Sequence, residues 1–322
     1  MDKHSKKWSI PLAPRRACWR IGLITLIGLP VLLTTPASAQ NFLFNTGDPN
    51  GLIATASRPG PGPGSGANQE TETGDDFLLT ARETIINHAS FIGLLPTGVN
   101  PTTDVSQVRV EIYRVFPKDS DVGRTSGPPT FSTPQVPTRV NSPSDVEFRD
   151  RDSADSNLTF TTTLLNPSFT AANSVDTGIH PKPGQNTGGD GAVTGQEVRF
   201  DVDFTTPFDL PPDHYFLVPQ VLLSNPDDHF LWLSAAKPIT GPGTTPFAPD
   251  LQSWIRNADL DPDWLRVGTD IVGAGAFNAS FSLSGTAIPE PGTLALLIGM
   301  GVSSMGLIGP RLRRRMRVGH RN

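Results

Sequence analysis

The sequence predicts a mainly β protein in which residues 40–287 fold as an antiparallel β-sandwich between two short apolar segments. Runs rich in Val, Ile, Phe and Thr recur along this region, and clusters of Pro, Gly, Asn and Asp, which favour turns, separate them. Several runs alternate apolar and polar residues, as a strand with one buried face does. A basic cluster precedes the first apolar segment and another follows the second, which indicates that both ends of the chain are directed to a membrane.

The N-terminal end has the three parts of a secretory signal peptide. A basic stretch consists of Lys3, Lys6, Lys7, Arg15, Arg16 and Arg20. An apolar run at residues 21–33 follows it, and the small residues Ala37 and Ala39 precede Gln40. We expect signal peptidase to remove residues 1–39 once the chain has entered the secretion translocon. The alternative, a retained N-terminal anchor, would need a longer apolar run.

The composition of residues 40–287 limits what this region can do. The only cysteine, Cys18, precedes it, so the exported region has no thiol chemistry and depends on its core or on bound ions for stability. The region carries 14 Lys and Arg against 29 Asp and Glu, a net charge of −15. Such a charge repels nucleic acid and anionic glycans and favours cation binding, although it is also typical of a solvated acidic surface. We therefore exclude nucleic acid as a partner.

Eight segments have the composition of strands. They are residues 76–81, 84–95, 105–116, 157–165, 193–204, 214–223, 229–234 and 277–284. The third segment alternates cleanly, with Val108, Val110 and Ile112 on one face and Arg109, Glu111 and Tyr113 on the other. This alternation is the pattern of a half-buried antiparallel strand.

The segments between the strands are expected to be loops. Residues 58–68 alternate Pro and Gly, residues 118–156 are charged and contain Pro, and residues 173–191 are rich in Gly and Asn. Short helical turns are expected only at residues 251–256 and 261–266.

Three aspartates at alternate positions form a candidate metal site. Asp259, Asp261 and Asp263 have the spacing with which an EF-hand loop begins, because alternate side chains can converge on one Ca²⁺. Trp264 stands where that loop needs Gly, so we expect no true EF-hand. A structural Ca²⁺ held by these groups, or by Asp227 and Asp228, is one interpretation. Alternatively these aspartates cap turns.

Three tryptophans form a candidate ligand site. Trp232, Trp254 and Trp264 lie late in the region and could stack on sugar rings if they were exposed on one face. More often such residues fill the core of a sandwich.

No catalytic motif is present. The sequence lacks H-E-x-x-H, G-x-S-x-G, G-x-x-x-x-G-K-[ST] and G-x-G-x-x-G. The histidines of the region, His88, His180, His214 and His229, lack ligand spacing. We therefore expect a protein that is not an enzyme and has no cofactor, with the structural Ca²⁺ above as the alternative. The alternative is a secreted polysaccharide hydrolase that takes its acid and base from Asp203, Asp227 or Asp228.

The C-terminal end predicts a membrane anchor. Residues 293–309 are apolar and, as a helix, slightly short of a bilayer of about 30 Å, which flanking residues can compensate. The basic residues that follow cannot cross the membrane and would stop transfer, leaving the C-terminus in the cytoplasm. They are Arg311, Arg313, Arg314, Arg315 and Arg317. A buried globular helix is the alternative, but it fits badly with the arginines.

Pro289, Glu290 and Pro291 stand directly before this apolar run. With the helix and the basic end, residues 288–317 closely resemble the PEP-CTERM sorting signal of exported bacterial proteins. The resemblance implies that an exosortase recognises the motif and that the helix is removed. It implies transient insertion in the inner membrane, and then a place on the cell surface, the outer membrane or in the extracellular matrix. It also implies an association with exopolysaccharide and biofilm.

Residues 73–80 and 85–95 resemble the opening strand pair of jelly-roll sandwiches found in many secreted PEP-CTERM proteins. This resemblance implies a jelly-roll-like two-sheet architecture without transferring any ligand residues. The sequence thus predicts an exported, non-catalytic structural or glycan-associated β-sandwich.

Overall fold

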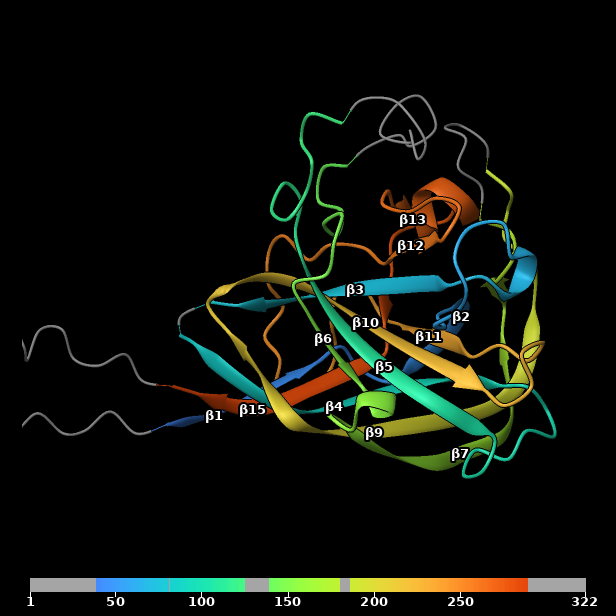
Figure 1. Ribbon diagram of the computed structural model, residues 1–322, viewed down its shortest axis with the longest axis horizontal. Coiled ribbons are helices and arrows are strands. Elements are labelled where there is room, and N and C mark those ends of the chain that lie inside the picture. Colours follow the sequence, from blue (N-terminus) through green and yellow to red (C-terminus); the bar gives the residue numbers. More distant parts are fainter. Residues whose placement is uncertain (1–38, 81, 125–138, 180–185, 289–322) are drawn as a thin grey trace, which may run out of the picture. The chain divides into compact units, whose positions relative to one another are not determined.

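The computed structural model describes residues 39–80, 82–124, 139–179 and 186–288. In these residues the chain is mainly β with antiparallel sheets, an arrangement consistent with the predicted β-sandwich (Figure 1). The described strands are β1 (Gln40–Asn45), β2 (Pro49–Ala56), β3 (Thr71–Leu79), β4 (Thr84–Leu95), β5 (Val105–Arg114), β6 (Arg149–Asp152), β7 (Thr159–Ala171), β8 (Asn173–Val175), β9 (Val193–Leu210), β10 (Asp213–Leu223), β11 (Leu231–Ala235), β12 (Trp254–Asn257), β13 (Leu265–Arg266), β14 (Asn278–Ala279) and β15 (Phe281–Ala287). The short helical turns are η1 (Gly66–Asn68), η3 (Ser153–Asp155) and η4 (Val267–Val272).

The first sheet, the β4 sheet, is built around the long strand β4. β9 pairs along one side of β4, and β7 pairs with β9. On its other side β4 pairs with β15 and then with β11. β1 extends the sheet beyond β15, β2 and β8 extend it beyond β11, and β14 also pairs with β11. Among the described strands, β2 and β8 form the only parallel pair.

The second sheet, the β3 sheet, has the order β13-β12-β3-β10-β5-β6. Its strands alternate as the sequence predicts. Val108, Val110 and Ile112 enter the main core, which also contains Phe91 and Phe200 from the β4 sheet. The two phenylalanine rings stack with their centroids 5.0 Å apart. The two sheets therefore bury their facing sides against each other, and the opposite side of the β3 sheet is available for other contacts.

A glycine on β4 makes room for one aromatic side chain of this core. A Cβ atom at Gly93 would lie 2.1 Å from Phe230 Cε2. Phe230 packs edge-on against both Phe91 and Phe200. The close approach of Phe230 to Gly93 therefore holds the three rings in one cluster.

Seven of the predicted strand segments are confirmed, and the eighth, residues 277–284, is divided into β14 and β15. The expectation of helical turns at residues 251–256 and 261–266 was wrong. Trp254–Asn257 and Leu265–Arg266 are strands, because β12 pairs with β3 and β13 with β12, and this tertiary pairing overrides local preference. A helical turn, η4, begins only at Val267.

Some strands lie in segments expected to be irregular or left unassigned. β6 falls within residues 118–156 and β8 within residues 173–191, while β1 and β2 precede the first predicted strand. The two segments that resemble an opening strand pair, β3 and β4, lie in different sheets.

The two ends of the described chain lie side by side. Gln40 of β1 is the register partner of Ala287 of β15, and the two strands run antiparallel (Figure 1). Ile288 N continues the edge by donating to Glu83 O at 2.8 Å. In the described residues we find no helix with the length and apolar character that a membrane span needs. The predicted transmembrane segment, residues 293–309, lies outside the described residues.

Candidate functional site

A cavity of about 670 Å³ opens on the side of the β3 sheet that faces away from the β4 sheet. Residues 145–147 and 258–262 contribute to its walls. Its lining is rich in charged side chains, namely Arg109, Arg256, Glu70, Glu72, Glu111, Asp145, Glu147, Asp259 and Asp261. Carboxylates outnumber the arginines, so the cavity carries an excess of negative charge.

Strand alternation places these groups on one side of the sheet. Because Val110 and Ile112 of β5 enter the main core, Glu111 points to the opposite side. On β3, Phe77 enters the main core, and Glu72 lies an odd number of residues away, on the cavity side. Arg256 reaches the same side from β12, which pairs with β3 at Glu72.

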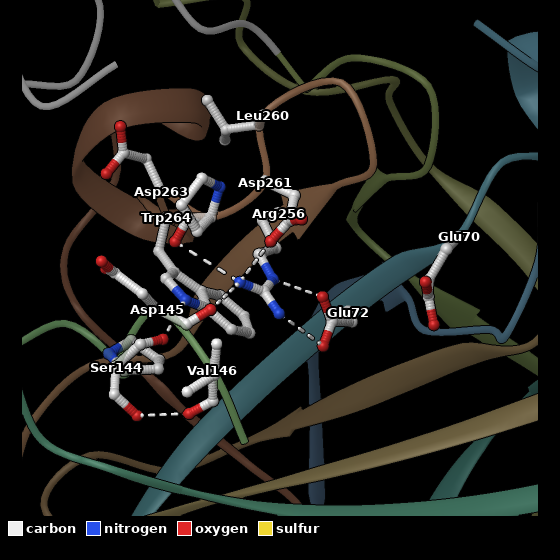
Figure 2. Close-up of polar contacts among 12 residues, drawn as sticks. Glu70, Glu72, Ser144, Asp145, Val146, Arg256, Leu260, Asp261, Asp263 and Trp264 are labelled. Carbon is white, nitrogen blue, oxygen red and sulfur yellow. Dashed lines mark hydrogen bonds and ion pairs between the residues drawn. The ribbon is translucent and has the colours of Figure 1, made fainter. Parts of the chain in front are cut away.

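Arg256 forms the centre of the charged network (Figure 2). Its Nε and Nη2 donate to the two carboxylate oxygens of Glu72, with Nη2 3.1 Å from Oε1. Its Nη1 is paired with Asp261 Oδ1 at 2.8 Å, and the guanidinium lies 4.4 Å from the centre of the Trp264 ring. Arg256 and Glu72 are only 5% and 6% exposed. Each charge is therefore buried with its partner, which is the condition for keeping both in the interior.

The Tyr113 hydroxyl connects two carboxyl groups. Its oxygen lies 2.6 Å from Glu72 Oε1 and 3.1 Å from Glu111 Oε2, and it accepts a hydrogen bond from Arg256 Nη2 at 2.8 Å. A phenol donates one proton, so it satisfies only one carboxylate, and the second carboxyl group must supply a proton of its own. The hydrogen bonds are complete when one of the two glutamates is protonated.

The surroundings of Glu111 favour its protonated form more than those of Glu72 do. Burial first, and the charge of Glu72 second, raise the pKa of Glu111 well above its ordinary value. Burial alone would also raise the pKa of Glu72, but the charge of Arg256 and its hydrogen bonds outweigh burial and lower that pKa. The environment thus shifts the pKa values of Glu72 and Glu111 in opposite directions.

Other carboxylates face the cavity with more exposure to solvent. The side chains of Glu70 and Asp261 are 31% and 54% exposed, and Glu147 and Asp259 are also exposed. Burial first, followed by the charge of Glu72, raises the pKa of Glu70. Burial also raises the pKa of Asp261, against the lowering effect of Arg256. A ligand that brings hydrogen-bond donors or positive charge would stabilise these groups in their ionised form.

The predicted convergence of Asp259, Asp261 and Asp263 on one calcium ion was wrong. Asp259 Oδ1 accepts from Gly64 N at 2.9 Å, Asp261 pairs with Arg256, and Asp263 Oδ1 pairs with Arg124 Nη2 at 2.7 Å. Each carboxylate has a different partner because a turn, and not an ion-binding loop, follows β12. In the parts of the chain that the structure describes, no group of three or more His, Cys, Asp or Glu side chains could hold a metal ion.

The predicted stacking of sugar rings on Trp232, Trp254 and Trp264 was also wrong. The three indoles are 1%, 1% and 2% exposed. Trp232 packs in the main core and donates from Nε1 to Ser280 O at 2.9 Å. Trp254 and Trp264 belong to a smaller apolar cluster on the cavity side of the β3 sheet. These side chains support the surrounding structure and present no ring face to a ligand.

The aspartates considered for the hydrolase alternative contact separate partners. Asp203 lies 2.9 Å from His88 Nδ1, Asp227 accepts from Asn68, and Asp228 accepts from Asn225 in its own turn. Asp227 lines a second cavity of about 300 Å³, to which neither of the other two contributes. Two carboxyl groups that share one partner lie instead on β3 and β5, where Glu72 and Glu111 both contact the Tyr113 hydroxyl.

Most of the predicted sorting elements lie outside the described residues. These are Pro289, Glu290, Pro291, the apolar run, the arginines Arg311, Arg313, Arg314, Arg315 and Arg317, and Ala37 of the signal-peptide cleavage site. Ala39 and Gln40 are described and are exposed, and Gln40 begins β1.

Of the charged cavity residues, only Asp259 and Asp261 were predicted as part of a site, and that site was for calcium; the others were not predicted. The polar face of the third segment already contained Arg109, Glu111 and Tyr113, which was the one available signal. The sequence contained no such signal for Glu72 and Arg256. Glu72 precedes residue 76, where the predicted strand began, and Arg256 fell in a segment expected to be a helical turn.

Comparisons with known proteins add no functional information. No family model matches the chain, and no curated protein and no solved structure matches it.

Proposed function

We propose that this chain is an exported surface protein that is delivered through a C-terminal sorting signal and then binds carbohydrate through the cavity of its β3 sheet. The signal peptide of residues 1–39 and the PEP-CTERM-like segment of residues 288–317 support the delivery. In this proposal an exosortase acts on Pro289, Glu290 and Pro291 while the apolar helix is held in the inner membrane. The mature protein then resides on the cell surface or in the extracellular matrix.

The paired ends of the described chain fit this route. Gln40 and Ala287 are register partners, so the two ends of the described chain lie beside each other in the β4 sheet. In this proposal, processing before Gln40 and after Ala287 removes no described strand of either sheet. Mass spectrometry of the mature surface protein tests the delivery, and a mature protein that retains residues 311–322 would contradict removal of the helix.

The cavity is the observation that carries the binding role. It combines a volume of about 670 Å³ with a lining rich in carboxylate acceptors and a buried Arg256–Glu72 ion pair that holds one wall. Its size is within the range of about 300–1,000 Å³ typical of small-ligand sites. We propose a jelly-roll-like ectodomain that binds a stretch of polysaccharide in this cavity.

The charge of the cavity selects among polysaccharides. Hydroxyl and amine groups donate hydrogen bonds to carboxylates, whereas uronate or sulfate groups would be repelled. We therefore expect neutral or amine-bearing glycans to bind and acidic glycans to bind poorly.

Non-catalytic binding is favoured over hydrolysis by the partners of Glu72. Arg256 occupies both of its oxygens and Tyr113 one of them, so this carboxylate is held by the protein and has little freedom to attack a substrate. Arg109 and Tyr113 similarly hold Glu111. In this proposal Glu72 and Glu111 therefore shape the cavity, and the exposed carboxylates contact the glycan.

Binding is tested with the full-length chain, purified in detergent, on immobilised neutral, amine-bearing and acidic polysaccharides. Glu70→Gln and Glu147→Gln together are expected to weaken binding about tenfold, equivalent to the loss of one or two hydrogen bonds. Asp155→Asn is the matched control, because it removes an exposed carboxylate from η3 outside the cavity. Retention of acidic glycans alone, or of none, would contradict the proposal, and release of new reducing ends would favour the hydrolase.

A further inference from the structure

Three side chains with complementary chemistry meet beyond the end of β11. Asn278 opens β14 and is the register partner of Ala235, the last residue of β11. Lys237 follows two residues later and donates from Nζ to Asn278 Oδ1 at 3.1 Å. The same Nζ donates to Asp250 Oδ1 at 2.7 Å, and Asn278 Nδ2 donates to Asp250 Oδ2 at 3.5 Å. An amine and an amide therefore contact each other, and one carboxylate contacts both.

The group is enclosed and its position is fixed. Asn278 is 1% exposed, and the side chains of Lys237 and Asp250 are 19% and 12% exposed. Main-chain oxygens of Asp250 and Leu251 also accept from Lys237 Nζ, the former at 2.9 Å. The amide carbon lies one C=O bond of about 1.23 Å from Oδ1, which limits the Nζ–Cγ separation to about 4.3 Å. A small rotation of the side chains would bring the two atoms together without movement of the backbone.

We propose that Lys237 and Asn278 form an intramolecular isopeptide bond, with Asp250 as the acid–base group. Asp250 accepts a proton from the Lys237 ammonium, and the neutral Nζ attacks Asn278 Cγ. The protonated Asp250 returns a proton to Nδ2, so the Cγ–Nδ2 bond breaks as the Nζ–Cγ bond forms. The amide nitrogen leaves as ammonia and takes up a second proton from Nζ to become ammonium, while Nζ keeps its third proton as the N–H of the new amide. Asp250 is regenerated as a carboxylate, so neither an oxidant nor a further reactant is needed.

The surroundings favour this reaction over exchange with solvent. Asp75 Oδ2 accepts from Ala279 N at 2.9 Å, which fixes the strand directly beside Asn278. Burial first, and the charge of Asp76 second, raise the pKa of Asp75 well above its ordinary value. Asp75 lies close enough to Lys237 for their charges to interact, and Asp250 is the carboxylate in direct contact with the amine.

A bond between residues 237 and 278 would give the exported region a covalent cross-link. Residues 40–287 contain no cysteine, so a disulfide cannot serve this purpose. The cross-link would join the segment after β11 to β14 and close the intervening chain, which contains β12, β13 and η4. It is independent of any ligand in the cavity.

Peptide mass spectrometry of the full-length protein, digested after denaturation, tests the bond. We expect a branched peptide that contains both Lys237 and Asn278, with a mass about 17 Da below the sum of its two parts because one ammonia is lost. Unlinked peptides at full mass would overturn the proposal. So would a loss of about 18 Da with Lys237 joined to Asp250, since water leaves when a carboxylic acid reacts.

Two variants and a control assign the roles. Lys237→Arg removes the nucleophile and Asp250→Asn removes the acid–base group, so both are expected to show full mass. Lys118→Arg is the matched control, because Lys118 forms an ion pair with Asp213 at 2.6 Å and has no amide partner in the described contacts. A cross-link that persists in Asp250→Asn would overturn the role of Asp250. If a variant fails to fold, the digest of the unchanged chain still decides whether the bond exists.

Discussion

Replacement of Arg256 by Met is expected to lower the free energy of unfolding by about 3–5 kcal/mol, since removing one member of a buried ion pair leaves the other uncompensated. Glu72 is 6% exposed and would lose the hydrogen bonds that Arg256 donates from Nε and Nη2. The Tyr113 hydroxyl would also lose the hydrogen bond that Arg256 donates to it. Urea unfolding followed by tryptophan fluorescence measures the change, and Trp264 beside the guanidinium contributes to the signal.

Two comparisons separate charge from packing in this experiment. Arg151→Met is the matched control, because that guanidinium lies over Phe208 and donates to main-chain oxygens without a buried carboxylate partner. It is expected to cost less than about 1 kcal/mol. The double change Glu72→Met and Arg256→Met is expected to cost less than Arg256→Met alone, since no charge is left unpaired. If Arg256→Met and Arg151→Met lowered the free energy of unfolding equally, the result would contradict the importance of the Arg256–Glu72 ion pair.

The free energy of unfolding is expected to fall as the pH rises from about 5 towards neutral. The pKa values of Asp75 and Glu111 are raised well above their ordinary values, and those of Glu70, Asp76 and Asp261 are also raised, in each case first by burial. Between the ordinary and the raised values the folded chain binds more protons than the unfolded chain, so stability decreases with pH through that window. Glu72 acts in the opposite sense, because its lowered pKa gives stability that is lost only as the pH falls below its ordinary value.

Glu111→Gln tests the contribution of one group to this slope. A glutamine amide can donate to Tyr113 as protonated Glu111 does, so the variant is expected to be within about 1 kcal/mol of the unchanged chain at about pH 5.5. Its stability should fall less on going to about pH 8. Glu147→Gln, at an exposed position of the same cavity, is the control and should leave the slope as it is. Urea unfolding at several pH values provides the measurement, and an unaltered slope in Glu111→Gln would refute the assignment.

The fold could be predicted because strand alternation is a local property. The alternation of Val108, Val110 and Ile112 predicts a buried face within one short segment, and β5 begins at Val105 as expected. Trp254–Asn257 could not be recognised in the same way, because what makes it a strand is its pairing with β3.

The cavity could not be predicted because its parts are distant in sequence. Glu72 lies 41 residues from Tyr113 and 184 from Arg256, and the three meet only after β12 has paired with β3. The aspartates at 259, 261 and 263 failed as a metal site for the same reason. Their spacing is visible in the sequence, but Arg124, which pairs with Asp263, lies 139 residues away, and the burial of Arg256 beside Asp261 depends on the pairing of β12 with β3.

The position of β15 determines how the described chain would respond to a pulling force. β15 lies between β1 and β4 and pairs with both along its length. Hydrogen bonds in antiparallel pairs run perpendicular to the strands, so traction on Ala287 along the strand loads all of them in shear instead of opening them one by one. A tether attached at this end would therefore pull against two ladders at once, and the domain would resist mechanical extraction at the point where it is held.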